Sequence, residues 1–330
     1  MSTVRIPAPT GESAPGLSEP APAALPAKTS PGQRSGARLV RPRSRRDNIH
    51  GWAFSAPFLA FFLIFLVWPM ISGAYMSLTG KSLTGANSGF IGLANYAEAF
   101  GDSDMWRSLG NTLYFTLIST VPLVVIALAL AALVNMGLPA QWLWRLSFFS
   151  PFLLASTVIS LFFAWMYNPE LGLFNDVLVK LGIPPVAWLN DPAVAMWAVV
   201  IATVWWTVGF NFLLYLAALQ NIPQQHYEAA SIDGAGGWRQ FFSISLPQLG
   251  PTTVMIAILQ ILASLKVFDQ IYQMTEGGPG GTTRSIVQYI FEAGFTGYRL
   301  GYSAAISYIF FGLILLIALV QVFITRKRSV

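Results

Sequence analysis

Residues 223–251 read PQQHYEAASIDGAGGWRQFFSISLPQLGP and separate two long apolar stretches of the chain. Pro223 suits the start of a helix, and residues 224–232 contain good helix formers. The glycines that follow stop this helix and permit a sharp turn; they are Gly234, Gly236 and Gly237. The segment therefore predicts a short helix followed by a tight turn.

A second short amphipathic helix is expected after the turn, and Pro247 is expected to end it. Its large apolar side chains are Trp238, Phe241, Phe242 and Ile244. The whole segment is then a helix–turn–helix lying on the inner face of a membrane. Such an element could present one small apolar helix to a cytoplasmic partner.

The rest of the chain is dominated by apolar sequence. Of its 330 residues, 55% are hydrophobic and only 10% are charged, too few to cover a water-facing surface. Six apolar stretches approach the ~20 residues that a helix needs to cross hydrocarbon; we place them at 52–78, 108–135, 143–167, 194–219, 252–275 and 303–325. The fold class expected is all-α, a polytopic membrane protein of about six transmembrane helices.

Charge indicates how the chain lies in the membrane. Residues 1–50 are rich in Ala, Pro, Ser and Gly with a basic run near their end, so we expect a disordered, basic cytoplasmic tail. Residues 51–325 form the transmembrane domain, 220–251 its cytoplasmic loop, and 326–330 a short cytoplasmic tail. Lys and Arg are about twice as abundant on the side of both termini, which places both termini inside. The net charge of +5 is thus assigned to membrane anchoring beside lipid, and no nucleic acid is expected.

The segment at 223–251 also resembles the signature loop of binding-protein-dependent ABC importer permeases. That loop has Glu-Ala-Ala, then Asp-Gly-Ala three residues later, then spaced Phe, Ile and Leu-Pro; the matching residues are Glu228, Ala229, Ala230, Asp233, Gly234, Ala235, Phe241, Ile244, Leu246 and Pro247. The resemblance implies the ABC importer permease fold and a coupling helix that docks in a cleft of an ATPase subunit. By resemblance, Glu228 would pair with a basic residue there, Ala229 and Ala230 would allow close approach, and Gly234 would make the turn.

A second stretch, residues 265–295, resembles the carbohydrate-uptake branch of that family, which includes maltose-type and glycerol-phosphate-type permeases. Its residues include Phe268-Asp269, Thr275 and Gly277-Gly278-Pro279. The resemblance implies a sugar importer in a prokaryotic plasma membrane, assembled with a second permease, two ATPase subunits and an extracytoplasmic solute-binding protein. ATP and magnesium would bind the ATPase subunits, so no cofactor, metal or catalytic residue is expected in this chain.

Polar residues inside the apolar stretches are candidates for the permeation path. Lys266 and Asp269 are spaced three apart, which puts them on one face of the fifth predicted helix, and Gln273 continues that face. Gln260 and Ser264 form a second stripe deeper in the same helix, and Asn211 with Trp205 and Trp206 forms a polar and aromatic patch in the fourth. These side chains could contact sugar hydroxyls. They could equally hold the helices together, Lys266 and Asp269 as a self-neutralising pair.

Other functions find less support in the sequence. An ABC permease for a non-sugar solute would share the loop, whereas an ion-driven secondary transporter would give it no purpose. A membrane enzyme would need convergent acidic or histidine residues at one boundary, and we find none. Gly80-Lys81-Ser82 resembles the end of a phosphate-binding loop, but the glycine required five positions earlier is Tyr75.

Overall fold

A computed structural model describes residues 45–85 and 89–328 of the chain. It divides into two units at Pro57 and Phe58, and the second unit carries every helix from α2 onward. Helix α1 begins at Arg45, so the expectation of a disordered tail through residue 50 is wrong for its last six residues. The remainder of that tail, 1–44, lies outside the described residues.

Helices make up about three quarters of the described chain, which also has a single β-bridge between Thr79 and Phe90. The longer helices are α1 (Arg45–Phe62), α2 (Trp68–Ser77), α4 (Ser103–Asn135), α5 (Gln141–Phe149), α6 (Ser156–Met166), α8 (Ala195–Gln220), α9 (Gln224–Ile232), α12 (Gly250–Leu265) and α15 (Leu300–Arg328). The shorter ones are α3 (Ala94–Gly101), α7 (Leu173–Lys180), α10 (Gly237–Gln240), α11 (Leu246–Gln248), α13 (Asp269–Thr275) and α14 (Ile286–Phe291). Three short π-helical segments, η1 (Leu63–Val67), η3 (Phe241–Ser245) and η4 (Glu292–Thr296), have wider turns than an α-helix. One short 3₁₀-helical segment, η2 (Ser150–Leu153), has tighter turns.

Four helices of the described residues are long and apolar enough to cross a membrane: Phe54–Ser77, Ser103–Asn135, Ala195–Gln220 and Leu300–Thr325. Two bent pairs raise the number to six if each pair is one span. The bends are 97° between Gln141–Leu153 and Ser156–Met166, and 64° between Gly237–Gln248 and Gly250–Leu265. The prediction of about six apolar spans agrees with the upper count, in which two of the six are bent pairs.

Pro151 accounts for the first break. Its ring removes a backbone donor at the start of η2, and the chain then turns extended at Leu154. The Leu154 carbonyl, which no longer lies in a helix, accepts a hydrogen bond from Trp206 Nε1 of α8 at 3.2 Å. Hydropathy reports apolar composition and not direction, so the sequence did not show this turn.

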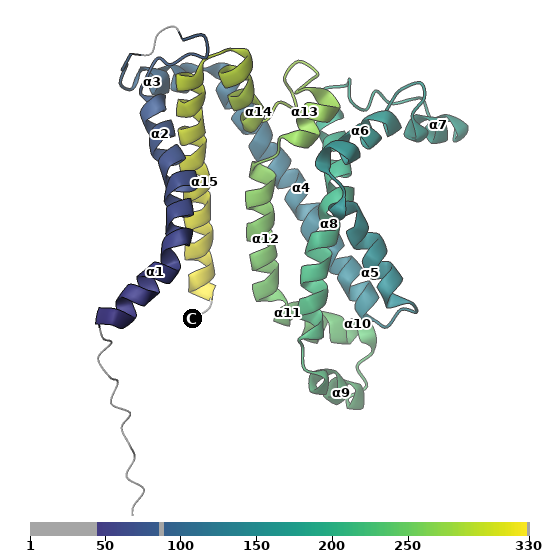
Figure 1. The fold of residues 1–330 in the computed structure, drawn as a ribbon. Helices are drawn as coiled ribbons and strands as arrows, with labels where there is room; N and C mark the ends of the chain where they lie inside the picture. Colours follow the sequence, from purple (N-terminus) through teal and green to yellow (C-terminus); the bar gives the residue numbers. More distant parts are fainter. Residues whose placement is uncertain (1–44, 86–88, 329–330) are drawn as a thin grey trace, which may run out of the picture. The chain divides into compact units, whose positions relative to one another are not determined.

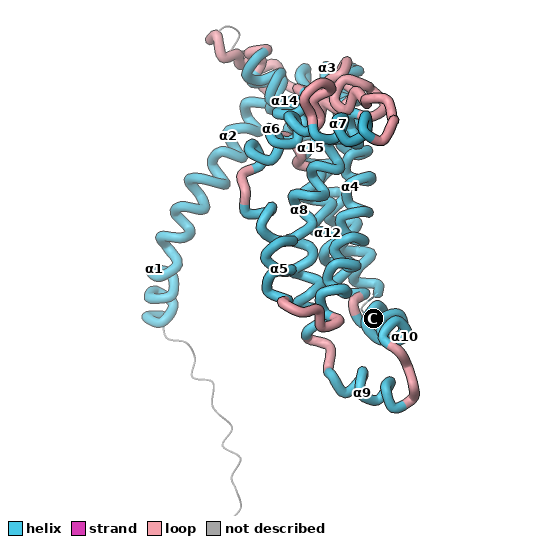
Figure 2. The backbone as a smooth tube through the Cα atoms, turned by 90° about the vertical axis from the view of Figure 1, so that its right-hand side faces the viewer, coloured by secondary structure: helices cyan, strands magenta, loops and turns pink. Residues whose placement is uncertain are grey.

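The two ends of the second unit are named after a helix that each contains (Figures 1 and 2). The α9 end holds α9 and α10, and the α7 end holds α3 and α7. Helices α4 and α8 run side by side, and their contact buries alanines of α4 against aromatic residues of α8. The residues buried there include Ala127, Ala131, Phe212 and Tyr215. Small residues four apart let the two helices approach closely, which is how apolar helices gain packing energy where no hydrophobic effect acts.

Helix α5 crosses α8 at Gly209. A Cβ atom added there would lie 2.2 Å from the Phe148 carbonyl oxygen and 2.8 Å from the Phe149 Cα. Both neighbours are backbone atoms, which no change of rotamer can move. Only glycine therefore permits this crossing.

Asp102 joins three helices at the α7 end. It caps α4 by accepting hydrogen bonds from the backbone amides of Asp104 and Met105, and its other oxygen accepts from the hydroxyls of Tyr289 and Tyr302. Burial raises the pKa of Asp102, but the hydrogen bonds from the two tyrosines and the two amides together lower it by more. The pKa of Asp102 therefore lies below the ordinary value. Asp102 is thus an ionised cap that fixes the starts of α4 and α15 together.

Ion pairs surround this cap. Arg299 donates two hydrogen bonds to the carboxylate of Glu98, at 2.6 and 2.7 Å, and this pairing raises the pKa of the guanidinium. Arg284 lies within 3.3 Å of Asp104 and 3.5 Å of Glu292. Charged residues at this end are therefore used to join α3, α4, α14 and α15.

Candidate functional site

Helix α9 covers the nine residues Gln224–Ile232, as the sequence predicted. It ends in a Schellman turn: the Gly234 amide donates to the Ser231 carbonyl at 3.1 Å, and the Ala235 amide donates to the Ala230 carbonyl at 2.9 Å. Gly234 has a φ of +75°, a backbone conformation that residues other than glycine rarely adopt. The predicted turn at Gly234 is confirmed, and two hydrogen bonds define its geometry.

One face of α9 is directed away from the protein. Glu228 and Ala229 are exposed, and Ile232, one turn after Glu228, is 88% exposed. Tyr227 and Ala230 are half-buried on the inward side. Ile232 was not among the predicted loop residues, although an apolar side chain four positions after Glu228 shares its face. The face combines one carboxylate with a flat, partly apolar surface.

Gln240 holds the two halves of the loop together. Its side-chain nitrogen lies 2.8 Å from Ser231 Oγ and 3.0 Å from the Ala235 carbonyl oxygen, so it ties α10 to both α9 and the turn. The Tyr227 hydroxyl hydrogen-bonds Ser245 Oγ at 2.8 Å and makes a second tie. The sequence does not mark Gln240, Tyr227 and Ser245 as structural residues, because polar side chains in a loop are ordinarily solvated.

The second half of the loop differs from the prediction at Pro247. Helix α10 continues through the wide turn η3 into α11, where Pro247 occupies the first turn, and the bend comes at Leu249. The second helix therefore ends one residue beyond the predicted Pro247. Pro247 and the wide turn η3 before it lie next to the bend at Leu249, and both features commonly accompany a change of helix direction.

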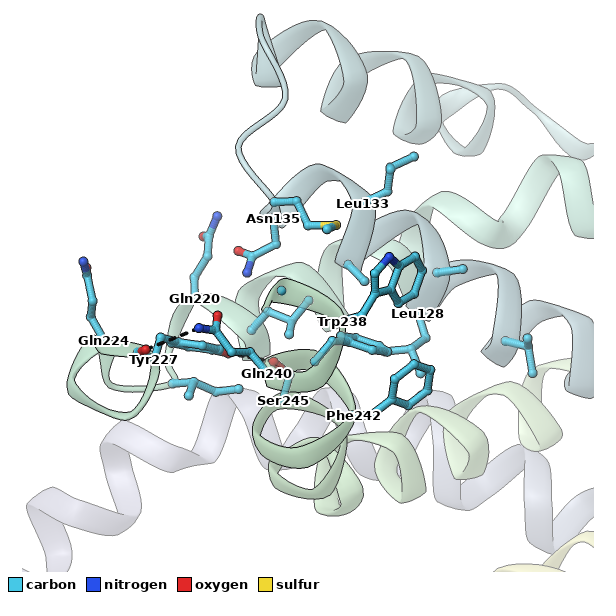
Figure 3. A pocket seen from close by; sticks show the side chains of 18 residues that line it. Leu128, Leu133, Asn135, Gln220, Gln224, Tyr227, Trp238, Gln240, Phe242 and Ser245 are labelled. Atoms are coloured by element: carbon cyan, nitrogen blue, oxygen red, sulfur yellow. Dashed lines mark hydrogen bonds between the residues drawn. The ribbon is translucent and has the colours of Figure 1, made fainter. Parts of the chain in front are cut away.

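A hollow of about 850 Å³ lies behind this half of the loop (Figure 3). The ends of α4 and α8 form one wall, with Leu128, Leu133, Asn135 and Gln220, and the loop forms the other, with Trp238, Gln240, Phe242 and Ser245. Phe241 also lines it and, like Ile244, is half-buried. The hollow thus separates the loop from the ends of the two long helices, and Trp238 and Phe242 remain 72% and 57% exposed beside it.

Three of the predicted path residues bond to one another deep in the helices. Asn211 Nδ2 of α8 donates to Gln260 Oε1 of α12 at 2.9 Å, and Gln260 Nε2 donates to Ser264 Oγ at 3.0 Å. Ser264 Oγ then hydrogen-bonds Ser119 Oγ of α4 at 3.1 Å. All four side chains are buried, so the chain of bonds links α4, α8 and α12.

Replacing Gln260 by leucine should destabilise the protein more than replacing Gln260 and Asn211 together. The single change leaves the buried Asn211 amide without its partner, at a cost of about 1–3 kcal/mol, whereas removing both partners is nearly neutral. The apparent melting temperature of the purified protein in detergent measures this. Equal losses in the single and the double variant would contradict the role given to this hydrogen bond.

A polar cavity of about 340 Å³ lies between α4, α8, α12 and the start of α13. Its aromatic residues are Phe115, Trp206 and Phe268, and its polar residues are Thr203, Thr207, Gln260, Ser264, Lys266, Asp269 and Gln270. Aromatic faces beside hydroxyl, amide and charged groups suit a polyhydroxylated solute, because rings cover its C–H faces while polar groups bind its hydroxyls. Lys266, Asp269, Gln260 and Ser264 of the predicted path residues line this cavity.

The predicted geometry of the fifth helix is wrong. Helix α12 ends at Leu265, Lys266 is its cap, and Phe268 is non-helical with φ −144° and ψ −63°. Lys266 and Asp269 therefore belong to different elements, and no ion pair between them is present in the described part of the chain. Asp269 instead accepts a hydrogen bond from Ser156 Oγ of α6 at 2.7 Å. At the break Val267 is buried, and Phe268 stacks on Tyr272.

Gln273 and Trp205 lie elsewhere. Gln273 lines a separate cavity of about 340 Å³ with Thr275 and Glu276. Trp205 packs edge-on against Phe163, with 5.5 Å between ring centroids, and faces an apolar cavity away from Asn211. The neighbouring Trp206 is the tryptophan that reaches the polar cavity. The predicted patch of Asn211 with Trp205 is therefore not formed.

Comparison with known proteins identifies the family. Residues 103–330 match the model of the family described as "Binding-protein-dependent transport system inner membrane component". This range is more than two thirds of the chain and includes the loop and the polar cavity. The chain belongs to this family, as the resemblance of residues 223–251 implied, and is a multi-pass membrane component of a transport system.

Several characterised relatives cover most of the chain. The sulfoquinovosyl glycerol transport system permease protein SmoG of Agrobacterium fabrum is 37% identical over 275 residues, which are 83% of this chain and 89% of that protein. The trehalose/maltose transport system permease protein MalF of Thermococcus litoralis is 36% identical over 84% of this chain and 94% of that protein. Both belong to carbohydrate transport systems by name, which confirms the resemblance to that branch.

The fold is also that of a solved transporter. A chain in the crystal structure of a bacterial ABC transporter that imports alginate superimposes with a TM-score of 0.76 at 24% identity, covering 86% of this chain and 98% of that chain. The predicted fold class, an all-α ABC importer permease, is confirmed.

Proposed function

We propose that this chain is a permease subunit of an ATP-driven sugar importer and that α9 transmits the action of a separate ATPase to the membrane helices. The exposed face of α9 is the observation that carries this proposal. Glu228, Ala229 and Ile232 are presented outward, while Gln240 and the Schellman turn hold α9 firmly to the rest of the loop. A force applied to α9 therefore reaches α10 and α12.

The path of that force follows the chain. The helical segment Gly237–Gln248 leads directly into α12 across the 64° bend. Helix α12 carries Gln260 and Ser264, which bond α8 and α4 and line the polar cavity. Movement of the loop would thus change the arrangement of the helices around the solute.

Replacing Glu228 by alanine should release the ATPase subunit and lower coupled uptake about tenfold or more. A hydrogen bond to a charged group contributes about 1.5–3 kcal/mol, and 1.4 kcal/mol corresponds to a factor of ten. The measurements are the ATPase retained on the purified chain and ATP-dependent uptake into proteoliposomes. Solute binding by the external protein should be unchanged.

His226→Ala is the matched control, because His226 is exposed on the same helix but lies about 200° around it from Glu228. It should retain the ATPase and transport normally. Wild-type uptake and ATPase retention in the Glu228 variant would refute the coupling role.

Sugar as the solute is supported by the names of the relatives and by the polar cavity. Rings of Phe115 and Trp206 beside Thr203 and Gln260 form a surface suited to a carbohydrate. Uptake of labelled oligosaccharides by proteoliposomes containing the assembled system tests this. Uptake of another solute with no sugar uptake would change the substrate class and leave the role of α9 intact.

The assembly that we propose has this chain, a second permease, two ATPase subunits carrying ATP and magnesium, and an extracytoplasmic binding protein. The chain supplies no metal ligands of its own in this proposal. Within the described residues, no group of three or more His, Cys, Asp or Glu side chains is placed to hold a metal. We propose that the α9 end and both termini lie in the cytoplasm, which places the α7 end outside.

A further inference from the structure

Helix α7 carries more apolar surface than the fold buries. The helix is anchored through Asn175, whose side chain accepts from the Val186 amide and from Trp188 Nε1, both at 3.0 Å. Phe174 and Trp188 pack against the buried cluster below. Gly172 makes the tight entry, since a Cβ there would lie 2.3 Å from the Asn168 carbonyl oxygen. The helix is therefore held in one orientation by the rest of the fold.

The orientation leaves a strip of aliphatic side chains uncovered. Leu173, Val177 and Leu181 are spaced four apart and thus lie on one face, with exposed fractions of 48%, 46% and 69%. Leu171 and Ile183 extend the strip at its two ends, with exposed fractions of 76% and 46%. The strip runs the whole length of the helix.

A charged pair lies on a neighbouring face. Lys180 and Asp176 form an ion pair of 2.7 Å, and both side chains are more than half exposed. This face is about 80° around the helix from the aliphatic strip. The helix thus has one face on the protein and an aliphatic strip beside the charged pair, with Val179, 56% exposed, on the far side of that pair.

We infer that α7 lies in the surface of the lipid bilayer with the aliphatic strip buried among the acyl chains. The strip follows an exposed apolar surface of α6 formed by Leu161, Phe162 and Trp165, and residues 167–172 connect α6 to α7. Figure 1 shows α7 next to α6 at the α7 end of the second unit, with its axis across the axes of the long helices. A helix with an aliphatic face and a charged face is suited to this interface.

The composition of the strip favours lipid over a protein partner. Its exposed residues are leucine, valine and isoleucine, whereas strong protein-binding sites are enriched in tryptophan, tyrosine and arginine.

The chain contains no cysteine, which allows a direct test with single-cysteine variants. Leu173→Cys and Val177→Cys place a nitroxide label on the strip, and Asp176→Cys and Lys180→Cys place it on the charged face as matched controls. The complete chain with its co-purified subunits is reconstituted in phosphatidylcholine nanodiscs. Collision of each label with oxygen, which partitions into lipid, and with water-soluble NiEDDA is then measured by electron paramagnetic resonance.

The strip labels should collide several-fold more with oxygen than with NiEDDA, and the control labels should show the reverse. Equal access of NiEDDA to all four positions would place the strip in water and overturn the inference. Low access of both reagents to the strip labels would show a protein cover. Protection that appears only after the solute-binding protein is added would assign the strip to that partner.

Discussion

Replacing Gly209 by alanine is expected to prevent most of the protein from folding. The added methyl group would lie 2.2 Å from the Phe148 carbonyl oxygen, and α5 and α8 would have to separate to accommodate it. Overpacking against movable side chains costs about 1–3 kcal/mol, and the cost here should reach at least about 3 kcal/mol because the obstacle is backbone. The yield of monodisperse protein and its apparent melting temperature in detergent are the measurements.

Gly312→Ala provides the comparison. Gly312 lies in the long helix α15 as Gly209 lies in α8, but no atom is within 4 Å of its added Cβ. Alanine there should be neutral or stabilising by up to about 1 kcal/mol, because it favours the helix more than glycine does. Similar yields for the two variants would show that α5 does not cross α8 as closely as described.

Replacing Gly234 by serine is expected to lower ATP-dependent uptake about 5- to 30-fold without a comparable loss of folded protein. Serine in the left-handed conformation at φ +75° costs about 1–2 kcal/mol. This strain lowers the equilibrium population of the native turn relative to other loop conformations by about 5- to 30-fold. The turn is exposed and lies outside the packed helices, so the effect should fall on coupling. Uptake into proteoliposomes, normalised to the amount of folded protein, measures it.

Gly236→Ser is the control within the same turn. Both glycines have no atom within 4 Å of an added Cβ, but Gly236 has φ −70° and ψ 166°, and it precedes α10 as its N-cap. Serine is favoured at an N-cap, so uptake should be unchanged. If the two variants lost uptake equally, side-chain bulk rather than backbone conformation would be the cause.

Local signals in the sequence predicted the elements that depend on local physics. The limits of α9 follow from Pro223 and Gly234, and the apolar stretches follow from composition. Apolar composition did not show the breaks after Pro151 and after Leu265, because it carries no information on helix direction, and the surroundings of both breaks include distant residues. Trp206 supports the break after Pro151, and the burial of Val267 accompanies the break after Leu265.

The candidate site shows the same division. Asn211, Gln260 and Ser264 were recognised as polar residues in apolar helices, but only the fold shows that they bond to one another. The sequence could not show which of Trp205 and Trp206 lines the polar cavity, because α8 is apolar on every side and its pattern indicates no buried face. The role of Gln240 depends on the path of the backbone through the turn.

Helix α4 is longer than a membrane is thick. Its 33 residues extend about 50 Å, whereas the hydrocarbon layer measures about 30 Å. Lying wholly within that layer would require a tilt well beyond the average of about 20°. Its ends therefore project beyond the hydrocarbon, one capped by Asp102 and the other lining the hollow behind Trp238. One continuous helix, which carries Phe115 in the wall of the polar cavity, thus extends beyond the hydrocarbon at both ends. A displacement at one end of α4 would therefore move part of the cavity wall as well as the other end.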